Sequence, residues 1–173
     1  MNNDLFYYFI YNLSKSIFFF IGIFFLINIE VSLSFFQIFN TATPSLVSVI
    51  FFLFIKKINY IPSNLNLICI GLLNDILLGN NLGLTSIFFL LFKYLTESIR
   101  INIADKKHEE DWLYFTLIFV VAFTVTLLIN MLLNLKIPDL GPILYYLGIT
   151  LVTFPIINII INSFYFIQRL FKS

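Results

Sequence analysis

Long apolar runs separated by short polar segments dominate this sequence. About 20 apolar residues in a helix cross a hydrocarbon core of about 30 Å, and the longest runs reach that length. The pattern predicts about six transmembrane helices, over residues 13–29, 45–55, 65–78, 82–99, 113–133 and 143–167. A transmembrane barrel would show alternating segments of about ten residues instead. We therefore expect an all-α integral membrane protein whose single domain covers residues 1–173.

The pattern leaves the end of the first span open. Glu30 closes the first apolar run, and we expect its carboxylate to be interfacial and solvated. Residues 31–39 then alternate apolar residues with serines and a glutamine, which suits a segment lying in the membrane interface. A longer, tilted first helix that runs to Phe39 is the alternative. Pro44 follows a polar turn and marks the start of the second span, since proline favours the first turn of a helix.

The composition agrees with a membrane location. Of the 173 residues, 60% are hydrophobic and only 11% are charged, and the mean hydropathy is +0.98. A soluble domain of this size has too much surface for so few polar residues to cover. A net charge of +1 excludes a global field that would recruit nucleic acid. The single cysteine, Cys69, can form no internal disulfide, and we interpret it as an inert thiol in the core.

The positive charges lie almost entirely on one side of the predicted spans. Eight of the ten lysines and arginines fall there: Lys15, Lys56, Lys57, Arg100, Lys106, Lys107, Arg169 and Lys172. The other side holds only Lys136, and Lys93 lies inside the fourth span. Because cytoplasmic loops are enriched in lysine and arginine, we expect both termini and residues 100–111 to be cytoplasmic. Residues 79–83 then form an outer corner.

The most informative stretch ends at that outer corner. Gly71, Asp75 and Gly79 are spaced by four, so they share one face of a helix, and Gly83 closes the corner. Two glycines leave that face flat enough for a second helix, so we expect Asp75 to point into a helix contact. A carboxylate at membrane depth costs about 2.5–3.5 kcal/mol and suggests a functional site. The equally weighted alternative is a buried Asp75 that only locks two helices together.

The fourth span carries a second pair of ionisable residues. Lys93 and Glu97 are four residues apart on one helix face, so we expect them to neutralise each other, with Lys93 reaching toward the inner interface. We expect His108, beside three acidic residues, to be solvated in a loop. Asparagines recur in spans three, five and six, where hydrogen bonding between helices is the expected role: Asn74, Asn130, Asn134, Asn158 and Asn162.

No motif of a nucleophile elbow, a phosphate loop or a paired Cys/His metal site occurs in the sequence. We therefore expect no enzymatic activity, no cofactor and no metal. The candidate structural or interaction residues are those singled out above: Gly71, Asp75, Gly79, Gly83, Pro44, Lys93 and Glu97.

A family resemblance runs through the same stretch. Pro44-Ser45-Leu46 is followed by an apolar span and then by the sequence GLLNDILLGNNLGL over residues 71–84. This order resembles the MreD family of rod-shape-determining membrane proteins, in which a proline opens the second span. The family signature is matched position for position by Gly71, Asp75, Gly79, Leu82 and Gly83. The basic loop before Trp112 and the late Pro155 also fit, although the specific part covers only about forty residues.

The resemblance implies a non-enzymatic, multi-pass protein of the bacterial inner membrane. It would maintain rod shape and guide lateral peptidoglycan synthesis in the cell-elongation machinery. The implied partners are an MreC-like single-span protein, an MreB-like actin homologue and wall-synthesis enzymes.

The family is also similar in fold to the substrate-binding subunits of energy-coupling-factor transporters. A substrate-binding subunit for uptake of a vitamin-type solute is therefore the alternative function. Such a subunit needs several polar and aromatic groups converging on one cavity. The sequence places only Asp75, Asn74 and Glu30 near the outer side, so we expect the interaction role rather than uptake.

Overall fold

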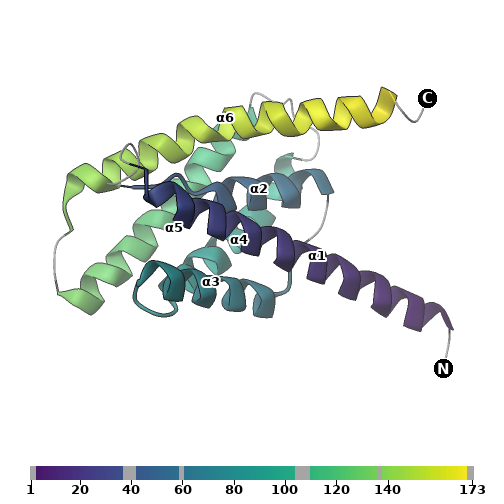
Figure 1. Ribbon diagram of the computed structural model, residues 1–173, viewed down its shortest axis with the longest axis horizontal. Coiled ribbons are helices and arrows are strands. Elements are labelled where there is room, and N and C mark those ends of the chain that lie inside the picture. The colour runs from purple at the N-terminus through teal and green to yellow at the C-terminus, as the bar shows by residue number, and fades with distance from the viewer. Residues whose placement is uncertain (1–2, 37–41, 59–60, 104–109, 136–137, 171–173) are drawn as a thin grey trace.

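A computed structural model describes residues 3–36, 42–58, 61–103, 110–135 and 138–170. These residues form six α-helices and no strand (Figure 1): α1 (Asn3–Ser34), α2 (Leu46–Ile58), α3 (Asn64–Leu78), α4 (Leu84–Ile103), α5 (Glu110–Asn134) and α6 (Leu140–Leu170). The prediction of an all-α fold is therefore confirmed for the described residues. Each observed helix overlaps one predicted span.

The short helix α2 is the centre of the molecule. It packs against α1, α4, α5 and α6, and none of its described side chains, over residues 46–56, is exposed. The reason is its sequence, since a helix that is hydrophobic on every side can only be stable when it is surrounded. Its fully buried side chains come from all round the helix: Val49, Phe51, Phe52, Leu53 and Ile55. With 13 residues α2 is about 20 Å long.

Phenylalanine rings fill the space between α2 and its neighbours. Phe115 of α5 stacks on Phe154 of α6, with ring centroids 4.5 Å apart and planes at 17°. Phe52 of α2 meets both rings edge-on, at 5.6 and 5.8 Å. Offset stacks and edge contacts each add about 0.5–1.5 kcal/mol beyond burial. These rings therefore form the part of the core that joins α2, α5 and α6.

The first helix corrects one expectation. α1 continues as a helix past Glu30 to Ser34, so the expected interfacial segment is wrong for residues 31–34. A turn follows, in which the amides of Phe35 and Phe36 donate to carbonyls three residues earlier. The alternative of a longer first helix is closer to the structure. Residues 37–41, which that alternative also included in part, lie outside the described residues.

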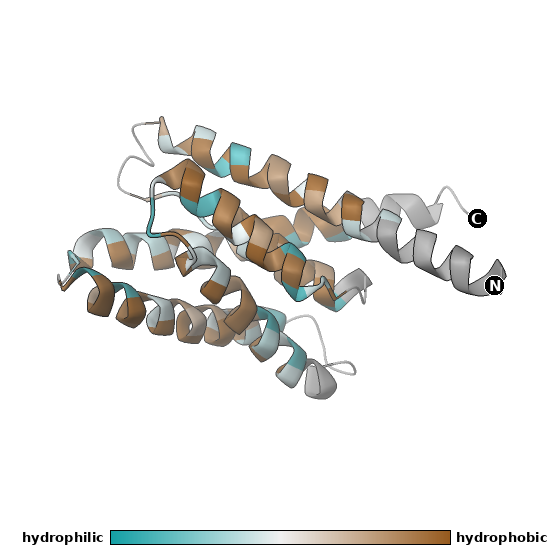
Figure 2. Ribbon diagram, turned by 90° about the horizontal axis from the view of Figure 1, so that it is seen from below, coloured by the Kyte–Doolittle hydropathy of each residue, from teal (hydrophilic) through white to brown (hydrophobic). Residues whose placement is uncertain are grey.

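Among the described residues, two helices are long and apolar enough to cross a membrane. They lie within Asp111–Asn134 and Leu140–Ser163, and shorter apolar helices lie within Phe19–Ser34, Leu46–Lys56 and Asn64–Leu78. Figure 2 shows hydrophobic residues on every side of the helices. Large aliphatic side chains also remain exposed along the outer faces of α1, α3, α5 and α6. These features support membrane association.

α3 and α4 approach each other closely at Gly71. A Cβ atom at Gly71 would lie 2.4 Å from both the Cα and the amide nitrogen of Ser86. Ser86 Oγ also donates to the carbonyl of Ile68 across the same contact, at 3.0 Å. The two backbones therefore approach so closely that only glycine fits at position 71.

We predict that Gly71→Ala lowers the stability of the protein, because overpacking against the Ser86 backbone costs about 1–3 kcal/mol. Gly22→Ala is the matched control, since Gly22 is also helical and a Cβ there meets nothing within 4 Å. The melting temperature of each variant is measured in detergent, by heating samples and detecting the remaining folded protein with size-exclusion chromatography. Equal melting of the two variants would contradict the close contact at Gly71.

Candidate functional site

Asp75 lies in the last turn of α3 and is fully buried. Its carboxylate accepts hydrogen bonds from the amide of Gly83 at 2.7 Å and from the amide of Thr85 at 3.2 Å. The Thr85 hydroxyl also donates to it. The first amides of a helix have no partner within the helix, and a carboxylate there is favoured by the helix dipole. Asp75 of α3 therefore caps the start of α4.

The backbone of Asp75 also stabilises the turn between α3 and α4. Its carbonyl accepts from the amides of Gly79 and Asn80, the latter at 2.9 Å, which closes the end of α3. Gly79 and Gly83 both have positive φ, at 68° and 90°, in a region that side chains disfavour. One residue thus fixes the whole turn between the two helices through its backbone and its side chain.

Gly79 has a different role from the predicted one. We expected it to clear the helix face for packing, together with Gly71. A Cβ at Gly79 would meet nothing within 4 Å, so no backbone approaches there. Gly79 ends α3 because of its left-handed conformation, and only Gly71 makes the close contact. The spacing of four residues could not distinguish a glycine that packs against a helix from one that ends a helix, because both fit the same spacing.

Sequence reasoning missed a second buried cap, at the start of α2. Glu30 was expected to be solvated, and this expectation is wrong: the side chain is buried and Oε1 accepts from the Val47 amide at 2.6 Å. The Ser45 amide donates to Thr150 Oγ1 of α6 at 3.1 Å, and the Ser45 and Ser48 hydroxyls are 2.6 Å apart.

This cap explains the neighbouring residues of the sequence. Pro44 is buried next to it, and its carbonyl accepts from the Leu46 amide at 3.0 Å. A signal was present, because two serines three residues apart after a proline are typical of a helix start. The sequence could not show that this start is buried and that a distant carboxylate reaches it.

Lys93 and Glu97 form the predicted ion pair on α4, with Lys93 Nζ 3.7 Å from Glu97 Oε1. Lys93 Nζ also donates to Asn64 Oδ1, in the first turn of α3, at 2.6 Å. This pair therefore lies beside the first turn of α3, whereas Asp75 lies in its last turn. The structure does not bring the two sets of ionisable residues together in one site.

Asparagines connect the outer corner to α5. Asn81 Nδ2 donates to Asn130 Oδ1 at 2.9 Å and to Asn134 Oδ1 at 3.2 Å. These bonds between segments confirm the expected role of Asn130 and Asn134. Asn74 is also buried, and its Oδ1 has no hydrogen-bond partner among the described residues.

The other end of the bundle is joined by charges and by a tryptophan. Lys56, near the end of α2, forms an ion pair with the buried Asp111 in the first turn of α5. Trp112 donates from Nε1 to the carbonyl of Leu151 of α6 at 3.1 Å. His108 lies outside the described residues.

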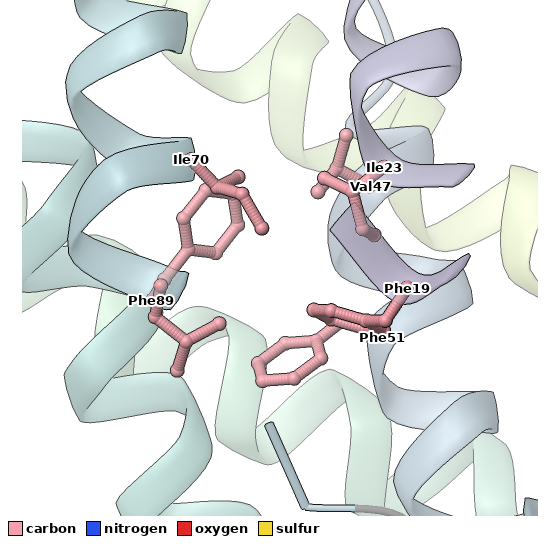
Figure 3. A pocket seen from close by; sticks show the side chains of 7 residues that line it. Phe19, Ile23, Val47, Phe51, Ile70 and Phe89 are labelled. Atoms are coloured by element: carbon pink, nitrogen blue, oxygen red, sulfur yellow. The ribbon is translucent and has the colours of Figure 1, made fainter. Parts of the chain in front are cut away.

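A small apolar pocket lies where α1, α2, α3 and α4 meet (Figure 3). It is lined by Phe19, Ile23, Val47, Phe51, Leu67, Ile70 and Phe89. Pockets that bind small ligands are open cavities with a few convergent polar groups. This pocket has no room for a water molecule, and its lining side chains offer no polar group that could orient a solute.

Comparison of the chain with protein-family models, with curated proteins and with solved structures gave no match. The function is therefore argued from the residues and from their geometry.

We predict that Asp75→Leu lowers the unfolding midpoint and the amount of protein in the membrane, because three donors at the start of α4 lose their acceptor. The loss is about 1–3 kcal/mol for such buried groups, and Asp75→Asn, which keeps one acceptor oxygen, falls between it and the unsubstituted protein. Asp139→Asn is the control, since Asp139 is an exposed acid in the loop before α6. Unchanged melting of Asp75→Leu would exclude the capping role.

We also predict that Glu30→Leu destabilises the fold by about 1–3 kcal/mol, since the buried Val47 amide would lose its acceptor. Glu30→Gln keeps an acceptor oxygen and should cost less. Asn28→Leu is the matched control on the same helix, because the exposed Asn28 side chain donates to the Phe24 carbonyl of its own helix. The same thermal assay measures all three, and a silent Glu30→Leu would disprove the cap.

Proposed function

We propose that this chain is a six-span inner-membrane protein of the MreD type, with both termini in the cytoplasm. It acts without catalysis, by binding other membrane proteins of the cell-elongation machinery. Its partners are an MreC-like single-span protein, an MreB-like actin homologue and wall-synthesis enzymes. In this role it maintains rod shape and guides lateral peptidoglycan synthesis.

The observation that carries the proposal is the closed hairpin formed by α3 and α4. Residues 71–84, on which the family resemblance rests, use their polar groups to hold this hairpin shut. The Asp75 carboxylate accepts hydrogen bonds from Gly83 and Thr85, and Gly71 lets the helices touch. A motif that builds a rigid shape, and offers no nucleophile or base, suits a protein that presents a surface to partners.

Contacts at the two ends of the bundle support the six-span arrangement. Lys56 and Asp111, both assigned to the cytoplasmic side, form an ion pair. Asn81 and Asn134, both assigned to the outer side, share a hydrogen bond. Segments assigned to the same side of the membrane are thus in contact at both ends.

The pocket chemistry favours interaction over solute uptake. A vitamin-type solute carries several polar groups that a binding site has to pair when it removes them from water. The pocket between α1 and α4 is lined by aliphatic and aromatic side chains and has no room for a water molecule. We therefore propose the interaction role, and solute uptake is the result that would contradict it in the test.

The test is depletion of this protein in the cells that encode it. We expect rods to widen and round up as new wall material is no longer directed along the side. Expression of the unsubstituted chain or of Asp139→Asn should restore the rods, whereas Gly71→Leu, which cannot pack against Ser86, should not. Cross-linking of the tagged chain should capture an MreC-like single-span protein. Unchanged cell shape after depletion, or tight binding of a vitamin-like solute by the purified chain, would overturn the proposal.

A further inference from the structure

The outward face of α3 is apolar but unusually short. Leu65 is 70% exposed and Ile76 is 64% exposed, with Ile68 and Leu72 exposed between them. Polar residues bound the helix at both ends, with the Ser63 cap at its start and Gly79 at its end. Fifteen residues rise about 22 Å, whereas the hydrocarbon of an ordinary bilayer is about 30 Å thick. The lipid-facing stretch of α3 is therefore about 8 Å too short.

Polar contacts from three helices gather at the start of α3. Lys93, half-way along α4, donates to Asn64, and Glu97 lies 3.7 Å from the same ammonium group. Asn66 of α3 donates to Ser16 of α1 at 2.5 Å. We call Asn64, Asn66, Lys93, Glu97 and Ser16 the polar belt. Charged groups in the middle of a bilayer are costly, so this belt indicates where the hydrocarbon ends on this side.

The helices on the other side of the molecule have longer apolar stretches. The membrane-crossing stretches of α5 and α6 each contain 24 residues, against the 15 of α3. This difference corresponds to about 13 Å along the helix axis. In Figure 1 α6 lies on the side of the molecule opposite α3 and extends past it at both ends. The molecule thus presents lipid-facing surfaces of two different hydrophobic lengths.

We propose that the α3 side of this protein is a lipid-shaping surface that thins the bilayer beside it. An apolar stretch shorter than the bilayer can be matched by thinning, whereas tilting would shorten it further. Phospholipid headgroups descend to the polar belt next to α3, while α6 is surrounded by hydrocarbon of ordinary thickness. The partner of this surface is the bilayer itself. The inference rests on the proposed membrane-spanning arrangement and is independent of the cell-shape role.

Spin labels on the two sides of the molecule test this inference. Cys69 is first replaced by alanine, and single cysteines are placed at Leu65 and Ile76 on α3. Tyr145 and Ile156 on α6 are the matched pair, since they are also exposed and have the same separation along a helix. The full chain is reconstituted in vesicles of phosphatidylcholine and phosphatidylglycerol with 18-carbon monounsaturated chains. Collisions with oxygen and with a water-soluble nickel chelate report the depth of each label.

We expect both α3 labels to lie nearer the headgroups than an unthinned bilayer allows, by about 4 Å in each leaflet, and both α6 labels to lie in hydrocarbon. Combined replacement of three of the five belt residues, by Asn64→Leu, Lys93→Met and Glu97→Met, should move the Leu65 label deeper into the bilayer. The depth of the Ile76 label should not change. If that variant does not fold, the depths of the labels on the chain with intact belt residues still test whether the bilayer is thinned.

Equal depths on α3 and α6 would overturn the thinning. Nickel contact at both α6 positions would overturn the membrane-spanning arrangement, and the inference with it. Neither result depends on cell shape. The depletion experiment tests the cell-shape role separately.

Discussion

The structure depends on hydrogen bonds that pair the buried amides at the start of its helices. The first amides of every helix lack partners within the helix, and an unpaired buried amide costs about 1–3 kcal/mol. Ser45 and Val47, at the start of α2, are buried. Glu30 of α1 and Thr150 of α6 accept the hydrogen bonds of Val47 and Ser45 instead. This need ties α2 to helices on two sides and holds the central helix in place.

The α3–α4 corner follows the same principle. The amides at the start of α4 are paired by Asp75, which belongs to the preceding helix. In both cases the carboxylate sits on the helix before the one that it caps, so one hydrogen-bond set joins two consecutive helices. Carboxylates suit this role because the helix dipole favours negative charge at the start of a helix. The two buried acids of these helices are thus explained by backbone pairing.

Around these polar contacts the packing is mostly aromatic. Rings from α2, α5 and α6 meet in stacked and edge-on pairs, with Phe52, Phe115 and Phe154 at the centre. In a membrane, apolar side chains gain little by leaving lipid for the protein interior, so close packing and hydrogen bonds have to hold the helices together. The close approach at Gly71 and the caps at Glu30 and Asp75 therefore carry much of the specificity of the fold.

The sequence by itself determined the fold class, the helix positions and the importance of the stretch around Asp75. These features rest on local signals: the length of each apolar run, the turn residues between runs and the spacing of glycines. The ion pair of Lys93 and Glu97 was also predictable, since both residues lie on one helix.

Only the tertiary structure decided which helix is central, which groups pair with Glu30 and Asp75, and that Gly71 packs against a helix while Gly79 does not. Those outcomes depend on which segments meet in space. A hydrophobic pattern shows that α2 is apolar on all sides, but it does not distinguish a helix surrounded by lipid from one surrounded by protein. The physical reason is that lipid and protein interiors are equally apolar, so burial at the centre of a bundle is set by the neighbours of a helix and not by its own residues.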